Sequence, residues 1–232
     1  MQKESYITAI SHNKKHWWWK SRREIFEEIL KKYIKKKIDI LDYGAGVGSN
    51  ISMLSSFGKC DAYDVNKNAL IYLKKKYRVV KKINKKYDLI FFTDTLEHIK
   101  NDKKILLFLK SRLKKNGIIF LTVPAYNFLW TSKDEDLKHF RRYNKGTLLH
   151  VTQKEFSILK ISYFNTLLFP ILSLILLFFR FFRIRFINQA ETQPLSIINF
   201  ILYKIFSFEK YFIKSANFPF GLSLLAILRK SK

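Results

Sequence analysis

A glycine-rich turn carries the clearest chemical signal in the sequence. Gly44, Gly46 and Gly48 alternate with other residues directly after an apolar run that ends at Asp42. Glycine tolerates positive φ and lets a ligand approach the backbone closely, and the helix that follows would point its amide groups at an anionic group. Dinucleotide sites use the spacing G-x-G-x-x-G, which would need a glycine where Ser49 stands. The spacing therefore favours S-adenosylmethionine (SAM), and a tight turn without a ligand is the alternative interpretation.

One acid is placed to meet the ribose of such a cofactor. Asp64 lies twenty positions after Gly44, near the end of the next apolar run, Cys60 to Val65. A carboxylate at that distance can accept hydrogen bonds from both ribose hydroxyls. We therefore predict that Asp42, Asp64 and Val65 contact the cofactor together with the glycine turn.

Methyl transfer from SAM also needs a group that takes the proton of the acceptor, and a general base contributes on the order of 10²–10⁴-fold. Glu97 and His98 follow the apolar run Tyr87 to Phe92, at the carboxyl edge of a predicted sheet, where open α/β folds bind ligands. His98 is the first candidate base, or else a histidine at a helix start that fixes the loop. Glu97 is either a site carboxylate or an acid that a helix N-terminus favours.

A second polar segment follows the next predicted strand. Its candidate site residues are His139, Arg141, Arg142 and Tyr143. His139 is a further candidate base. The two arginines could clamp a phosphate or carboxylate of the acceptor, or pair with the acids at positions 134–136, and the tyrosine could bind the acceptor or pack. The acids and histidines could also bind a divalent metal, but nothing fixes a ligand spacing, so we predict no metal site.

Apolar runs alternate with amphipathic segments over most of the chain. This alternation predicts an α/β fold with a doubly wound, mostly parallel sheet. We expect strands at 38–42, 60–65, 78–80, 87–92, 118–123, 156–163 and 221–228, and helices at 17–36, 50–56, 69–77 and 105–113.

Several motifs resemble a known family. Leu96-Glu97-His98-Ile99, after a Leu-Asp-x-Gly-x-Gly-x-Gly turn, resembles the small-molecule class I SAM-dependent methyltransferases, which include the ubiquinone-pathway O-methyltransferases. A closer similarity to bacterial and archaeal methyltransferases of type 11 or 12 rests on five segments: His16-Trp17-Trp18-Trp19-x-x-Arg22-Arg23, Val123-Pro124-Ala125-Tyr126, Leu129-Trp130, Asp134-Glu135-x-Leu137-x-His139-x-Arg141-Arg142-Tyr143 and Pro219-Phe220-Gly221-Leu222-Ser223-Leu224-Leu225.

The resemblance implies a Rossmann-like class I methyltransferase fold with a seven-stranded sheet and helices on both faces. It implies SAM contacts at Gly44, Ala45, Gly46, Asp64 and Thr93, with Asp94 beside them, and it suggests that Arg22 pairs with the SAM carboxylate. Many class I enzymes place an acid after the third strand to meet the adenine. Here Asn84 follows that strand, which is a departure from the pattern.

The composition points to anionic partners. The chain has 44 Lys and Arg against 18 Asp and Glu, a net charge of +26, which favours nucleic acid or an anionic membrane face, although coding bias can also enrich lysine. A single cysteine, Cys60, excludes a disulfide within the chain and fits a reducing compartment. The polar start, Met1 to Ser11, shows no secretory signal, so we expect a cytoplasmic protein.

A long apolar stretch interrupts the last predicted strand pair. We divide the chain into a leading segment (1–36), a SAM-binding core (37–163), an apolar helical insertion between strands six and seven (164–216) and the last core strand (217–232). Both flanking strands belong to one sheet, so the two apolar helices, 166–182 and 194–213, must enter a membrane and return or lie flat in its interface. Packing on the core or on a second subunit is the alternative. Cations that suit anionic head groups are Arg180, Arg183, Arg185, Lys204, Lys210 and Lys214.

The sequence therefore predicts a methyltransferase at the inner face of the cell membrane. Its acceptor would be amphiphilic or lipid-linked, with transfer to oxygen, which the ubiquinone-pathway resemblance implies. The alternatives are an RNA methyltransferase, suggested by the charge, and a SAM-binding scaffold without catalysis.

Overall fold

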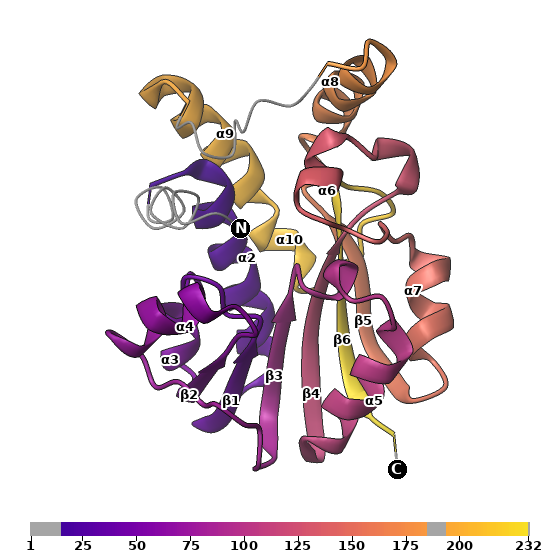
Figure 1. Cartoon of the computed structure of the whole chain (residues 1–232). Coiled ribbons are helices and arrows are strands. Elements are labelled where there is room, and N and C mark those ends of the chain that lie inside the picture. The colour runs from indigo at the N-terminus through magenta and orange to yellow at the C-terminus, as the bar shows by residue number, and fades with distance from the viewer. Residues whose placement is uncertain (1–14, 185–193, 232) are drawn as a thin grey trace.

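A computed structural model describes residues 15–184 and 194–231 of the chain (Figure 1). Its centre is a six-stranded sheet in the order β2-β1-β3-β4-β6-β5. The first four strands run parallel, and β6 is antiparallel to both of its neighbours, β4 and β5. The strands are β1 (Ile38–Tyr43), β2 (Gly58–Tyr63), β3 (Tyr87–Thr93), β4 (Leu113–Pro124), β5 (Phe156–Phe164) and β6 (Ser223–Lys230). This topology confirms the predicted Rossmann-like α/β class.

One predicted strand is reduced to a single bridge. Val79, within the predicted strand 78–80, pairs only with Ala62 at the outer edge of β2. The Ala62 N–H donates to the Arg78 carbonyl, and the Val80 N–H donates to the Ala62 carbonyl. The chain then leaves the sheet at two exposed lysines, 81 and 82. The described residues therefore form six strands, one fewer than predicted.

Helices cover both faces of the sheet. They are α2 (Trp17–Tyr33), α3 (Ile51–Ser55), α4 (Lys67–Lys74), α5 (Asp102–Ser111), α6 (Ser132–Asp136), α7 (Lys145–Thr152), α8 (Phe169–Phe181), α9 (Ser196–Phe208) and α10 (Lys210–Ile213). Phe26 of α2 packs on Phe91 and Phe120, in a cluster that α3 and α10 join. The opposite face buries Ile90 and Ile119 beneath α5 and α7. Because neighbouring strand residues point to opposite faces and both faces are covered, the buried middle parts of β3 and β4 are continuous apolar runs, at 89–92 and 118–121.

The apolar insertion is anchored to the core through α9 and α10. α9 lies beside α2 (Figure 1), where the Tyr203 hydroxyl donates to Glu24 at 2.7 Å. The predicted single helix 194–213 is divided into α9 and α10 at Glu209, although the backbone of this residue keeps helical φ and ψ values of −58° and −24°. Its buried carboxylate accepts hydrogen bonds from the backbone amides at 165–167. Among the described residues, no helix combines the length and apolarity needed to cross a membrane. The predicted cation Arg185 and the segment Met1 to Ser11 lie outside the described residues.

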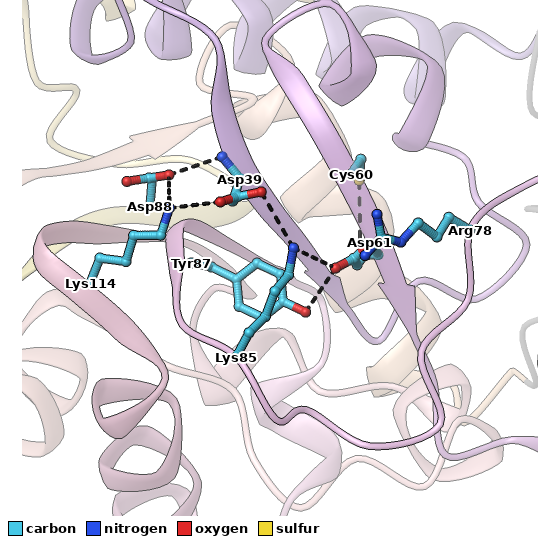
Figure 2. Close-up of polar contacts among 8 residues, drawn as sticks. All are labelled: Asp39, Cys60, Asp61, Arg78, Lys85, Tyr87, Asp88 and Lys114. Atoms are coloured by element: carbon cyan, nitrogen blue, oxygen red, sulfur yellow. Dashed lines mark hydrogen bonds and ion pairs between the residues drawn. The ribbon is translucent and has the colours of Figure 1, made fainter.

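A cluster of ion pairs lies toward the amino ends of the parallel strands (Figure 2). Asp61, fully buried, pairs with Arg78 at 2.7 Å and with Lys85 at 3.0 Å, and the Tyr87 hydroxyl donates to it. Lys114 lies 2.8 Å from the carboxylate of Asp88. The opposite, carboxyl end of the parallel strands is where ligands bind in such folds.

Candidate active site

The glycine turn after β1 has the backbone that its sequence predicts. Gly44, Gly46 and Gly48 have φ values of +79°, +53° and +77°. A Cβ on Gly44 would lie 2.3 Å from the hydroxyl of Thr95, and one on Gly48 would lie 2.6 Å from the Tyr77 ring. A Cβ on Gly46 would meet nothing within 4 Å, so this glycine faces open space. Glycine is thus required by packing at the two outer positions, and the middle position leaves room for a ligand.

Asp64 fixes the turn from the end of β2. Its carboxylate accepts hydrogen bonds from the Gly46 N–H and the Asn66 N–H, both at 2.8 Å. The amides of Gly44 and Ala45 donate to the Tyr63 carbonyl, so β2 and the glycine turn are joined at several points. Val65 follows with 79% of its surface exposed. Val65 is therefore open to a ligand, and the cofactor contacts predicted for Asp64 and Val65 stay predictions.

Asp42 ends β1 beneath the turn and is fully buried. Its Oδ2 has no hydrogen-bond partner among the described residues. Burial, together with the nearby charge of Asp64, raises the pKa of Asp42 to about 7. Burial thus favours the protonated carboxyl group of Asp42 in mildly acidic solution, and its predicted contact with the cofactor stays a prediction.

Arg22 reaches the site from α2. Its guanidinium forms an ion pair with Asp94 and donates to the Thr122 hydroxyl. The Thr122 hydroxyl in turn donates to Asp94 at 3.0 Å. Asp94 directly follows Thr93, the last residue of β3. The leading helix is therefore joined to two strand ends, and the predicted pairing of Arg22 with the SAM carboxylate stays a prediction.

Glu97, His98 and His139, which we call the histidine corner, come together beside these strand ends. The rings of His98 and His139 are edge to face with centroids 4.6 Å apart. The backbone N–H of Phe140 donates to the Glu97 carbonyl at 2.8 Å, which joins the two segments. Burial and the neighbouring His139 lower the pKa of His98, and burial and the Asp94 charge raise the pKa of Glu97 well above its usual value.

Asp134, which the sequence offered only as a neighbouring acid, orients the corner. Nδ1 of His139 lies 2.8 Å from its Oδ1, and Arg142 donates to both carboxylate oxygens. Although burial acts to raise the pKa of Asp134, the hydrogen bonds from His139 and Arg142 hold it well below its usual range. A capping box with Thr131 starts the short helix α6 that carries this acid. The Thr131-x-x-Asp134 spacing was the available sequence signal.

Arg141 and Tyr143 are placed differently. Arg141 pairs with Asp102 at 2.8 Å and donates to the Lys100 carbonyl, and the buried Tyr143 hydroxyl donates to the same acid. Arg141 therefore pairs with Asp102 and not with an acid at 134–136. Arg142 pairs with Asp134, as the ion-pairing alternative predicted. Their predicted contact with the acceptor stays a prediction.

A cleft of about 700 Å³ opens between the loop that carries His139 and the end of α8. Its lining combines cationic and aromatic side chains with one carboxylate. The main members are Trp130, Glu135, Phe140, Arg141, Arg180 and Arg183. Arg180 also holds the helix to this loop, because it donates to the Phe128 carbonyl at 2.6 Å. The contribution of α8 to this cleft depends on tertiary structure, and no local motif signals it.

Comparisons with known proteins agree with this geometry. A family model described as a methyltransferase domain matches residues 18–157, and no curated protein matches the chain. A SAM dependent methyltransferase from Archaeoglobus fulgidus is similar in structure (18% identity, 90% of this chain and 94% of that chain covered, TM-score 0.54). So is N-methyltransferase NodS from Bradyrhizobium japonicum WM9, solved with S-adenosyl-L-homocysteine (10% identity, 92% and 88% covered, TM-score 0.55).

The plantazolicin methyltransferase BpumL, also solved with S-adenosyl-L-homocysteine, is a third structure with this fold (16% identity, 91% of this chain and 86% of that chain covered, TM-score 0.57). At such low identity these likenesses establish the fold, whereas the family model spans more than half of the chain. The chain therefore belongs to the methyltransferase domain family and has the class I fold of SAM-dependent methyltransferases.

Proposed function

We propose that the protein transfers the methyl group of SAM to an oxygen of an amphiphilic acceptor at a membrane surface. One observation carries the proposal: a Cβ on Gly44 would lie 2.3 Å from Oγ1 of Thr95. The glycine turn therefore touches the segment that leads directly into Glu97 and His98. A donor held by the turn and an acceptor held at the histidine corner would meet at this edge of the sheet.

For methyl transfer, the protein must align the acceptor atom with the methyl group of SAM, and the proton of the acceptor must have a group or solvent to leave to. SAM supplies an electrophilic methyl group on a positively charged sulfur. Holding two reactants in line contributes up to about 7–11 kcal/mol in model systems. The lowered pKa of His98 keeps its imidazole neutral at neutral pH, and Asp134 fixes the ring of His139. We therefore place the departure of the acceptor proton at the histidine corner.

The surfaces of α8 and α9 support an amphiphilic acceptor. The residues buried on α8 and α9 are Ser173, Phe206 and Ser207, and both helices expose large apolar side chains, with 81% of Phe181 exposed. The other exposed apolar residues of these helices are Ile171, Leu174, Ile175, Leu177, Phe178, Ile197, Ile198, Phe200, Ile201, Ile205 and Phe208. An exposed apolar area of this extent marks an interaction surface, and a cation close to an anionic bilayer contributes about 1 kcal/mol. Arg180, Arg183 and Lys204 flank the apolar residues in sequence.

The cleft next to His139 supports the same class of acceptor. Three arginines line it against one acid, Glu135, and aromatic rings form much of its remaining wall. Guanidinium groups suit phosphate or carboxylate groups. A lipid-linked compound would place its polar group in the cleft and its chain along α8.

Labelled SAM identifies the acceptor. The purified protein is incubated with labelled SAM and a fractionated membrane extract, and the label is followed into lipid, protein and RNA. We expect label in an organic-soluble product. Label in RNA alone would overturn the acceptor class, and label on a nitrogen of the product would correct the atom methylated. His139→Ala should retain SAM affinity and lose turnover.

Vesicle binding tests the membrane surface. Deletion of the insertion would remove Phe206, Glu209 and Ile213 from the core, so point substitutions are the better probe. The double variant Leu174→Gln and Phe178→Gln should weaken co-sedimentation with phosphatidylglycerol vesicles at least about tenfold, and SAM affinity should not change. Leu107→Gln, at an exposed leucine of α5, is the matched control. Equal vesicle binding by the double variant and the control would contradict the assignment.

A further inference from the structure

The histidine corner gathers three groups of the kind that bind metals. Glu97, His98 and His139 each bring one nitrogen or carboxylate oxygen to within 4.8 Å of the others. Ligands about 2.0–2.2 Å from a shared ion lie roughly 3–4 Å apart. Small side-chain rotations would therefore bring all three into contact with one ion. The backbone bond from Phe140 to Glu97 holds the two segments in register.

The carboxylate of Glu97 supplies an independent observation. Only 1% of this residue is exposed, and its Oε2 has no hydrogen-bond partner among the described residues. A buried carboxylate without a partner is costly. The nearby cation Arg22 is already engaged by Asp94, a second carboxylate close to the corner. The corner therefore has a buried carboxyl oxygen without a partner, which a bound cation would satisfy.

The two imidazoles are also oriented as metal ligands are. The ionised carboxylate of Asp134 can only accept, so Nδ1 of His139 donates to it over 2.8 Å and Nε2 keeps its lone pair. His98 likewise forms a hydrogen bond with the Leu137 backbone. Metal-binding histidines typically donate their other ring N–H to a carboxylate or a carbonyl. Arg142 in turn holds Asp134 through two hydrogen bonds of 2.8 Å.

We propose that Glu97, His98 and His139 bind one divalent transition-metal ion. Two imidazoles and one carboxylate suit Zn²⁺, Mn²⁺, Fe²⁺ or Co²⁺ and leave positions open for a further ligand. The identity of that ligand rests on the proposed function: it is the acceptor oxygen. The ring nitrogens of His98 and His139 that bind the ion do not act as bases while it is bound. The ion lowers the pKa of the acceptor hydroxyl, so the proton leaves from the histidine corner to solvent. A lone pair of the oxygen then forms the bond to the methyl carbon, and the electrons of the broken C–S bond stay on sulfur, which yields S-adenosylhomocysteine.

Cobalt is the probe for the site. The full-length protein is stripped of metal with a chelator and titrated with Co²⁺, and binding is followed by visible absorbance and calorimetry. We expect one ion per chain, displaced by Zn²⁺. His139→Ala and Glu97→Gln should each weaken Co²⁺ binding at least about tenfold. Substitution of a group that only orients a metal ligand already costs about 10–100-fold in affinity, so loss of a direct ligand should cost at least as much. His150→Ala, at an exposed histidine of α7, is the matched control, and SAM affinity reports that each variant is folded.

The outcomes separate this inference from the proposed function. Absence of Co²⁺ binding by the wild-type protein, or equal binding by wild type and His139→Ala, overturns the metal site whatever the acceptor is. Co²⁺ binding that depends on the three residues supports the metal site even where no lipid is methylated. That second result would count against the proposed acceptor class alone.

Discussion

The imidazole of His139 and the carboxylate of Asp134 form a hydrogen bond of 2.8 Å between Nδ1 and Oδ1. The same carboxylate receives two bonds from Arg142, so one buried acid sets the direction of the histidine and ties down the loop that carries it. Because His139 lies in a loop, its ring orientation depends on the hydrogen bond to Asp134.

Asp134→Asn should lower kcat about 10–100-fold, the usual cost of losing a group that orients a metal-binding or catalytic histidine. The asparagine keeps the size of the side chain but loses the negative charge that forms the ion pair with Arg142. The affinity for SAM should stay the same, because Asp134 does not contact the glycine turn. Kinetics and SAM calorimetry measure the two quantities. Asp136→Asn, at an exposed acid of the same helix, is the control, and equal losses in both variants would count against an orienting role.

Asp64→Ala should abolish measurable SAM binding. The substitution removes the predicted ribose acceptor and also frees the Gly46 and Asn66 amides that this carboxylate holds. Hydrogen bonds to a charged group contribute about 1.5–3 kcal/mol each, so we expect a loss of affinity of at least about 100-fold. Calorimetry with S-adenosylhomocysteine measures it. Glu27→Ala, on the surface of α2, should bind normally, and retained affinity in Asp64→Ala would exclude this acid from the site.

Alanine at Gly44 and at Gly46 should separate packing from ligand approach. Both glycines have positive φ, which costs a residue with a Cβ about 1–2 kcal/mol. Gly44→Ala adds a clash with Thr95 at 2.3 Å, whereas Gly46→Ala meets no atom within 4 Å. Thermal unfolding should therefore show a larger loss of stability for Gly44→Ala. Both variants should bind SAM poorly, and normal affinity in Gly46→Ala would mean that the ligand does not approach this backbone.

Asp42 should make the unfolding free energy depend on pH. Burial raises its folded pKa from 3.8 to about 7, so the folded state holds a proton that the unfolded state has released. The contribution of Asp42 to stability is therefore full below about pH 4, falls as the pH rises towards 7, and is constant above that. One pKa unit corresponds to about 1.4 kcal/mol. Denaturation of the SAM-free protein between pH 4 and 8 should show a flatter profile for Asp42→Asn than for wild type, and parallel profiles would refute the assignment.

Much of the fold is predictable because its signals are local. Strands buried on both faces, such as β3, read as continuous apolar runs, and the alternation with amphipathic helices indicates the sheet. The burial of Glu209 has no local signal, since its carboxylate accepts hydrogen bonds from backbone amides more than forty positions away. The edge segment around Val79 looked like a strand because its composition is right, but it forms only one bridge.

The site divides in the same way. The glycine turn and Asp64 lie only twenty positions apart and follow neighbouring strands, so their meeting in space could be predicted from the sequence. Glu97 and His139 were each identifiable as reactive residues, but their meeting depends on a backbone hydrogen bond between segments some forty positions apart. The expectation of no metal site rested on the lack of a defined ligand spacing in the sequence, and it stays a prediction. Asp102 became a partner of Arg141 through tertiary structure alone.

The position of β6 has a consequence for synthesis. This strand separates β4 from β5 in the sheet, yet it is translated after both of them and after α8 and α9. While the ribosome is still making the insertion, β4 and β5 have no hydrogen-bonding partner on their facing edges. The apolar helices thus emerge beside an unfinished sheet, and a chaperone or an early encounter with a bilayer would protect both until the closing strand arrives.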